Sequence, residues 1–299
     1  MPKTYLRYKN ERTFNTISSG TSNIVLASNG HSVIVGANEM IIVWNAFTGA
    51  QEKKFINEEK TFPINSIAVS KNLTQQSEVM LTEEEQNMQH FLVAGGYSDG
   101  SISIFDFKTT QVETTFHGHN SEVTSLIFNH DDSLLVSGGK DTFIIVWDIV
   151  SQTGMFKLSG HKGEITNLKF HTFRLPLPGV TRDEEDEDDD SKYTTQTLLL
   201  SSSKDSLIKV WDHEKQFCVD TLTGFSYEVW DFDICDNLLV AGSIDNELKI
   251  WKLEQKEVKP RIYSYATYTG TLPRTGKERV MGVAYHSDAN LLAVHSGER

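Results

Sequence analysis

One short spacing recurs along this chain and constrains its fold more than any other feature. An aromatic residue follows an aspartate by six positions at four places, namely Asp99 and Phe105, Asp141 and Trp147, Asp205 and Trp211, and Asp245 and Trp251. A weaker copy is formed by Asn38 and Trp44. The clearest copies read LLVSGGKDTFIIVWD and LLLSSSKDSLIKVWD. A fixed internal repeat indicates similar units stacked side by side, and it moves the functional question from catalysis to binding.

The aromatic positions give the length of the unit. Successive aromatics are separated by 61, 42, 64 and 40 residues. Two of these steps match a period of roughly 40–45 residues, and the other two exceed it by about twenty. Polar inserts at 71–90 and 172–195 account for the excess, and the second insert holds the acidic run 183–190. Neither insert has the apolar alternation of a strand, so we expect surface loops there.

Each unit contains four short apolar segments separated by turn-forming residues. In one copy these segments are 123–128, 134–137, 143–147 and 155–158. They are rich in β-branched and aromatic residues, and no stretch of the chain has a convincing helical period. A single four-stranded sheet would leave two apolar faces exposed, so the units must stack radially. The sequence therefore predicts an all-β fold, a β-propeller.

The polar residues of two repeats resemble those of the WD40 family. The complete set of markers occurs twice, as Gly118, His119, Ser137, Asp141 and Trp147, and as Gly160, His161, Ser201, Asp205 and Trp211. In that family the His, Ser, Asp and Trp side chains form a hydrogen-bonded chain inside one blade. A buried indole and a buried carboxylate both need such partners. The resemblance thus implies a structural network in these two blades.

A Ser–His–Asp set is also the pattern of a hydrolytic triad, but the catalytic interpretation is disfavoured here. The set recurs once per blade and ends in an indole donor, so we predict that the protein is not an enzyme. Asp99, Asp245 and Trp251 belong to copies that lack the full set. We expect those blades to depend mainly on apolar packing.

The ends of the chain do not complete a ring of the seven-bladed type. Residues 1–12 form a tail, and the strand-like segment 13–17 is placed where the last blade of a propeller often receives its outer strand. Segments 280–286 and 291–296 resemble the first half of a sixth blade, and no further copy of the repeat follows. We therefore expect about five blades and part of a sixth in 13–299, within a longer polypeptide or one whose remainder is not resolved.

Charge and composition limit the classes of partner. The net charge is −13, to which the run 183–190 contributes −8, and an acidic balance argues against indiscriminate binding to a phosphate backbone. The acidic run is either a solvated loop or a docking site for a basic partner. Two cationic groups are candidates for contact with RNA or an acidic partner, although both also fit solvated surface charges: Lys3, Arg7 and Arg12, and Arg274, Lys277 and Arg279.

Motifs for other functions are missing from the sequence. There is no secretory apolar segment, membrane-spanning run or lipidation signal. Cys218 and Cys235 lack metal spacing, so we interpret them as reduced core thiols of an intracellular protein. The histidines show no zinc pattern, and no phosphate-binding loop is present. We predict no metal, cofactor, small-molecule substrate or membrane partner.

A more specific resemblance is carried by the order of several segments along the chain. These are Tyr5-Leu6-Arg7-Tyr8, Gly154-Met155-Phe156-Lys157-Leu158, Cys218-Val219-Asp220-Thr221 with Glu228-Val229-Trp230, and Gly270-Thr271-Leu272-Pro273-Arg274. Together they resemble the first propeller of the tandem-propeller WD-repeat subunits of the UTP-B subcomplex (the Utp-twelve type, WD-repeat protein three in animals). This family is part of the nucleolar small-subunit processome. The acidic insert and the incomplete fifth blade depart from its pattern.

The resemblance implies a non-catalytic scaffold in ribosome biogenesis, located in the nucleus and nucleolus. Its partners would be other UTP-B and processome proteins, with precursor rRNA and guide small nucleolar RNA in the same ribonucleoprotein during pre-18S rRNA processing. The alternative is a general WD40 adaptor, such as a substrate receptor of a ubiquitin ligase or a signalling propeller that recognises a peptide.

Overall fold

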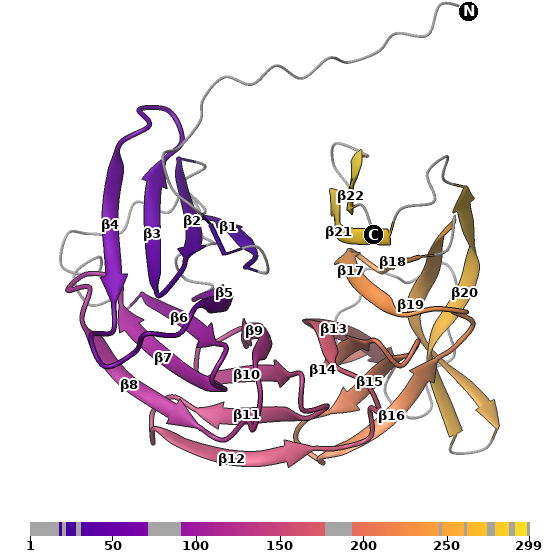
Figure 1. Ribbon diagram of the computed structural model, residues 1–299. Coiled ribbons are helices and arrows are strands. Elements are labelled where there is room, and N and C mark those ends of the chain that lie inside the picture. The colour runs from indigo at the N-terminus through magenta and orange to yellow at the C-terminus, as the bar shows by residue number, and fades with distance from the viewer. Residues whose placement is uncertain are drawn as a thin grey trace, which may run out of the picture.

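The regular structure of this protein is built from β-strands. A computed structural model describes residues 18–19, 22–27, 31–70, 91–176, 193–244, 247–259, 262–273, 279–286 and 291–297. In these residues the strands form five four-stranded antiparallel sheets and one two-stranded sheet. The sheets are arranged around a common centre as the blades of a propeller (Figure 1). The predicted all-β propeller, with five blades and part of a sixth, is confirmed.

Within each blade the strands are arranged in chain order, with the first strand nearest the centre of the ring and the fourth at its rim (Figure 1). Blade one contains β1 (Ile24–Leu26), β2 (Ser32–Ala37), β3 (Met40–Asn45) and β4 (Gln51–Ile56). Blade two contains β5 (Ile64–Val69), β6 (Leu92–Tyr97), β7 (Ser101–Asp106) and β8 (Val112–His117). Blade three contains β9 (Val123–Phe128), β10 (Leu134–Gly139), β11 (Ile144–Asp148) and β12 (Thr153–Leu158).

The later blades have the same order but longer strands. Blade four contains β13 (Ile165–Pro176), β14 (Tyr193–Ser203), β15 (Ile208–Asp212) and β16 (Phe217–Leu222). Blade five contains β17 (Val229–Cys235), β18 (Leu238–Ser243), β19 (Glu247–Lys259) and β20 (Ile262–Pro273). The two-stranded sheet pairs β21 (Arg279–His286) with β22 (Leu291–Gly297).

Apolar side chains fill the spaces between neighbouring blades, as the stacking argument requires. Phe55 of blade one and Phe105 of blade two are fully buried in one cluster, with ring centroids 5.7 Å apart. Separate clusters join blades two and three, three and four, four and five, and five and the β21–β22 sheet. Because blades two to five each contribute to the cores on both of their sides, the blades stabilise one another.

The turn after the repeat aspartate has the same unusual backbone in three blades. The next residue has a positive φ in each case, with values of 86° for Gly100, 73° for Thr142 and 66° for Ser206. In blade two a side chain is excluded at this position, since a Cβ on Gly100 would lie 2.6 Å from the carbonyl oxygen of His119. The residue after the repeat aspartate of blade two is therefore restricted to glycine, because the backbone that leads into blade three approaches it closely.

The second insert is shorter than the sequence suggested. Residues 172–176 and 193–195, which we expected in a surface loop, extend the hairpin of β13 and β14. The reason is an apolar contact that lies far away in sequence: Phe173 is 2 % exposed and packs edge-on against Tyr265 of β20, with ring centroids 5.3 Å apart. The rest of this insert, including the acidic run, and the insert at 71–90 lie outside the described residues.

Polar side chains also connect the innermost strands of successive blades. Asn23 of blade one bonds the backbone of Ile67 in β5 twice, donating to its oxygen at 2.8 Å and accepting from its nitrogen at 2.7 Å. Asp231 of β17 makes a similar contact from blade five to the β21–β22 sheet. It accepts the amide of Val283 in β21 at 2.7 Å. Burial raises the pKa of Asp231 to about 6, although its N–H donors favour the ionised form. The β21–β22 sheet is thus held at its inner edge by a partly buried carboxylate.

Replacing Asp231 by alanine is expected to release this inner edge. The amide proton of Val283 should exchange with solvent about tenfold faster or more, because it loses a bond to a carboxylate worth roughly 1.5–3 kcal/mol. Hydrogen exchange followed by mass spectrometry measures the effect, and the amide of Val210 in β15 serves as an internal reference. Unchanged protection of Val283 would contradict the assigned role of Asp231.

Candidate functional site

The complete set of markers in blade three forms one continuous hydrogen-bonded chain. His119 Nδ1 lies 2.9 Å from Asp141 Oδ1, and His119 Nε2 lies 2.8 Å from Ser137 Oγ. Trp147 Nε1 donates to the same Ser137 oxygen at 2.8 Å. Gly118 leaves room for the indole, since a Cβ there would lie 2.6 Å from the Trp147 ring. The four predicted side chains are therefore brought together as a unit.

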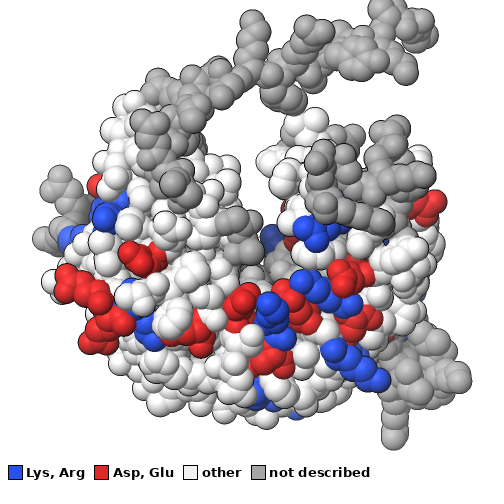
Figure 2. Space-filling model, viewed as in Figure 1, with Lys and Arg blue, Asp and Glu red and all other residues white. Residues whose placement is uncertain are grey.

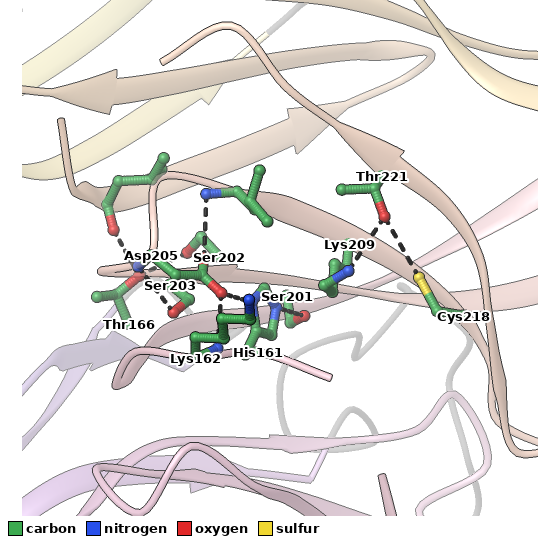
Figure 3. Close-up of polar contacts among 12 residues, drawn as sticks. His161, Lys162, Thr166, Ser201, Ser202, Ser203, Asp205, Lys209, Cys218 and Thr221 are labelled. Atoms are coloured by element: carbon green, nitrogen blue, oxygen red, sulfur yellow. Dashed lines mark hydrogen bonds and ion pairs between the residues drawn. The ribbon is translucent and has the colours of Figure 1, made fainter. Parts of the chain in front are cut away.

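Blade four repeats this arrangement with nearly the same distances (Figure 3). His161 Nδ1 lies 2.8 Å from Asp205 Oδ2, and His161 Nε2 lies 2.8 Å from Ser201 Oγ. Trp211 Nε1 donates to Ser201 Oγ at 2.8 Å. The carboxylate of Asp205 also accepts the amides of Lys162 at 2.9 Å and Leu207 at 3.1 Å.

The donor and the acceptor in each of these hydrogen bonds follow from the chemistry of the groups. A carboxylate only accepts, so the histidine Nδ1–H donates to it and the histidine Nε2 accepts the serine proton, while the serine oxygen accepts the indole N–H. This requires a neutral imidazole, and burial lowers the pKa of His119 accordingly. Burial acts to raise the pKa of Asp141, but the Asn120 amide and the His119 ring outweigh it and hold this pKa below its usual value.

The same geometry excludes hydrolysis by these two sets. Ser137 and Ser201 are both 0 % exposed, so no substrate carbonyl can reach either hydroxyl oxygen. Each serine proton is directed at a histidine that is itself at most 7 % exposed. A nucleophile needs both a base and access to the reacting atom, and only the base is present here. Each network instead joins the loop that carries the histidine to the strands of its blade.

The incomplete copies use other contacts. Asp99 of blade two accepts Lys60 Nζ at 2.9 Å and the Ser101 amide at 2.9 Å. In blade five the Trp251 ring is 3 % exposed and packs on Phe225, which stands where the complete blades have histidine, with centroids 5.2 Å apart. Asp245 lies outside the described residues.

Of the predicted cationic contacts, only Arg279 falls in the part of the chain that the structure describes. Lys3, Arg7, Arg12, Arg274 and Lys277 lie outside it. Arg279 is the first residue of β21, and its guanidinium carbon lies 4.4 Å from the centroid of the Trp230 ring. Sequence reasoning did not single out Trp230 or Lys204 as site residues. A signal was available, because Thr124 and Thr166 occupy the place of Trp230 in the two complete blades.

Charges of both signs are interspersed on one face of the protein. Figure 2 shows Lys and Arg interspersed with Asp and Glu on the face that it presents, without an extended area of one sign. Ion pairs join Lys140 to Glu122 at 3.4 Å and Lys204 to Glu164 at 2.7 Å, in matching turns of blades three and four. Such a surface favours specific protein contacts over the tracking of a phosphate backbone.

Among the described residues there is no cluster of metal-ligand side chains and no helix that could cross a membrane. None of their His, Cys, Asp and Glu side chains gather in a group of three or more that would hold a metal ion. No helix among them is long and apolar enough to cross a membrane. Both cysteines, Cys218 and Cys235, are unpaired and half-buried.

Comparisons with known proteins give the fold and the family. The chain is 28 % identical over 204 residues to Protein ROOT INITIATION DEFECTIVE 3 of Arabidopsis thaliana, covering 68 % of this chain and 43 % of that protein. It is 33 % identical over 192 residues to WD repeat-containing protein 90 of Xenopus tropicalis, covering 57 % of this chain and 10 % of that protein. Mouse Pre-mRNA-processing factor 19 is 25 % identical over 55 % of this chain and 29 % of its own length.

The chain thus spans less than half the length of these curated relatives. Among solved structures, a chain of the mitotic checkpoint complex crystal structure superposes with a TM-score of 0.64 at 18 % identity, covering 91 % of this chain and 73 % of that one, which shows the fold alone. A family model described as the WDR3 first beta-propeller domain matches residues 31–253. Since this match includes most of the chain, the protein belongs to the WD40-repeat family of WDR3 first β-propeller domains.

Proposed function

We propose that this protein is a non-catalytic scaffold in ribosome biogenesis, which helps to assemble the small-subunit processome for pre-18S rRNA processing. The observation that carries the proposal is the match of residues 31–253 to the WDR3 first β-propeller family. This match agrees with the resemblance, described above, to the first propeller of a UTP-B subunit. UTP-B is part of the nucleolar small-subunit processome. The proposed partners are other UTP-B and processome proteins, in one ribonucleoprotein with precursor rRNA and guide small nucleolar RNA.

The physical character of the propeller suits assembly. Apolar cores between all neighbouring blades and buried networks in blades three and four make a stiff body whose loops and rim are free to contact partners. The net charge of −13 and the interspersed surface charges support protein contacts as the main mode of binding. Direct RNA contact would then be confined to local basic segments.

A general WD40 adaptor is the second candidate. It is favoured by the breadth of the relatives, since proteins with names as different as ROOT INITIATION DEFECTIVE 3 and Pre-mRNA-processing factor 19 match this chain at similar identity. A propeller of this kind would present a short peptide or a substrate to another protein.

Affinity purification of the tagged full-length protein separates the two candidates. We expect UTP-B and other processome proteins by mass spectrometry, and precursor rRNA by sequencing of the bound RNA. Recovery of ubiquitin-ligase or signalling subunits without processome proteins and without precursor rRNA would favour the adaptor and overturn the proposal.

A further inference from the structure

The innermost strands of blades two to five and of the β21–β22 sheet each carry a β-bulge, whose extra residue is Asn65 in β5 and Met281 in β21. Register shifts in the other three blades place the extra residue at Thr124 in β9, Thr166 in β13 and Trp230 in β17. Each threonine hydroxyl bonds the next blade, Thr124 to the oxygen of Ile165 at 2.6 Å and Thr166 to the oxygen of Val229 at 2.8 Å. The Trp230 indole makes no such bond, since its Nε1 has no hydrogen-bond partner. Blade five therefore differs from the two complete blades at a position where a bulge is able to redirect a side chain.

Two cations from the neighbouring blades lie against the Trp230 ring. Lys204 Nζ, in the turn after β14 of blade four, lies 4.5 Å from the ring centroid. The guanidinium carbon of Arg279, at the start of β21, lies 4.4 Å from it. Both distances are within the range of cation–π contacts. Blade four and the β21–β22 sheet flank blade five on opposite sides (Figure 1), so the cations reach the indole from its two neighbours.

Hydrogen-bond donors at this place lack acceptors. Trp230 Nε1 and Arg279 Nε are both buried without a hydrogen-bond partner. No carboxylate among the described residues forms an ion pair with Arg279, whereas Lys204 pairs with Glu164 at 2.7 Å. Buried donors without partners cost free energy, and an uncompensated guanidinium adds to that cost. Trp230 and Arg279 are each partly exposed as whole residues, so a negatively charged group from outside the chain would reach the guanidinium through its exposed part and supply the missing counter-ion.

We propose that Trp230, Arg279 and Lys204 form an anion-binding site at the inner edge of the ring, which receives a carboxylate side chain from an acidic segment of a protein partner. The guanidinium supplies donors in a planar fork that matches a carboxylate. The indole orients the guanidinium by stacking, and Lys204 turns from Glu164 toward the ligand. This inference rests on the proposed role as an assembly scaffold, because it names the chemistry of one partner.

An acidic peptide suits this site better than RNA. Single-stranded RNA would use the tryptophan as a stacking platform, but cations from both neighbouring blades already lie against the ring. The face in Figure 2 also has no extended basic area to follow a phosphate chain. A single carboxylate needs only the local cations.

Binding of fluorescein-labelled octaglutamate to the full-length protein, followed by fluorescence polarisation, tests the site. Arg279→Gln should weaken binding about tenfold or more, since it removes charge-assisted hydrogen bonds, and Lys204→Gln should weaken it by a smaller factor. Lys140→Gln is the matched control and should bind as the wild type does. Lys140 occupies the equivalent turn of blade three, where its amide bonds the oxygen of Glu122 at 2.9 Å as the Lys204 amide bonds that of Glu164 at 3.0 Å.

Three results would overturn the inference. They are failure of the wild-type protein to bind octaglutamate at millimolar concentration, equal weakening by Lys140→Gln, and tighter binding of a labelled oligouridine that is lost in the same variants. Thermal melting of each variant separates loss of binding from loss of folding. Wild-type protein that purifies with the processome but does not bind octaglutamate would refute this inference alone. Binding of octaglutamate without recovery of the processome would refute the proposed function alone.

Discussion

Replacing Trp211 by alanine should lower the free energy of unfolding by about 3–5 kcal/mol, the cost of emptying a large aromatic site in a packed core. Trp211 is 2 % exposed and belongs to the cluster that joins blades three and four. Its indole also supplies the donor for the buried oxygen of Ser201. The substitution therefore removes apolar contacts between two blades and one end of a polar network. Urea denaturation measures the loss as a lower midpoint concentration, with an unchanged dependence of the unfolding free energy on urea concentration.

Trp211→Phe separates the packing contribution from that of the indole N–H. The ring stays buried while the bond to Ser201 is lost, so we expect a smaller loss of about 1–2 kcal/mol. Blade two has this arrangement naturally, because Phe105 stands at the equivalent position and is 0 % exposed. A loss below about 1 kcal/mol for Trp211→Ala would show that the blade interface does not depend on this ring.

Replacing Asp205 by alanine is expected to lower the free energy of unfolding by about 1–3 kcal/mol, because it leaves buried donors without their acceptor. The carboxylate accepts His161 Nδ1 at 2.8 Å and the amides of Lys162 and Leu207 at 2.9 and 3.1 Å. Asp141→Ala should behave in the same way in blade three. Glu113 is an exposed carboxylate on β8, and Glu113→Ala serves as the control, with a change of no more than about 0.5 kcal/mol.

The contribution of Asp205 should depend on pH in a defined direction. Burial acts to raise its pKa, but the His161 imidazole and the Lys162 amide outweigh burial and hold the pKa below its usual value. A carboxylate whose pKa is lower in the folded than in the unfolded state stabilises the fold above the unfolded pKa of about 4, and this stabilisation is lost as the pH falls through the folded pKa. The stability difference between wild type and Asp205→Ala should thus be largest near pH 7 and shrink below about pH 4. A difference that grows on acidification would contradict the network.

Local repeats made the fold and its polar networks predictable from sequence. The Ser, Asp and Trp markers recur at the same spacing in both complete blades, each time after a Gly-His pair, so their chemistry indicates that they meet, and the structure places them within hydrogen-bonding distance. Blade five was recognised as incomplete for the same reason, since Phe225 and Ala241 replace the polar markers.

Contacts between blades were not predictable in this way. The extension of β13 depends on Phe173 meeting Tyr265, a residue that is remote in sequence and belongs to another blade. The setting of Trp230 depends on cations from the blades on both of its sides. A repeat pattern shows what each unit contains, whereas the contents of the interface between two units depend on how the units are packed.

The most direct test of the account is the composition of the complex that purifies with the tagged full-length protein from cells. A scaffold of the small-subunit processome should bring down UTP-B proteins together with precursor rRNA that contains the 18S sequence. Protein recovered without either component, or in a stable complex with an unrelated ligase or signalling assembly, would contradict the assignment to ribosome biogenesis and leave only the propeller fold.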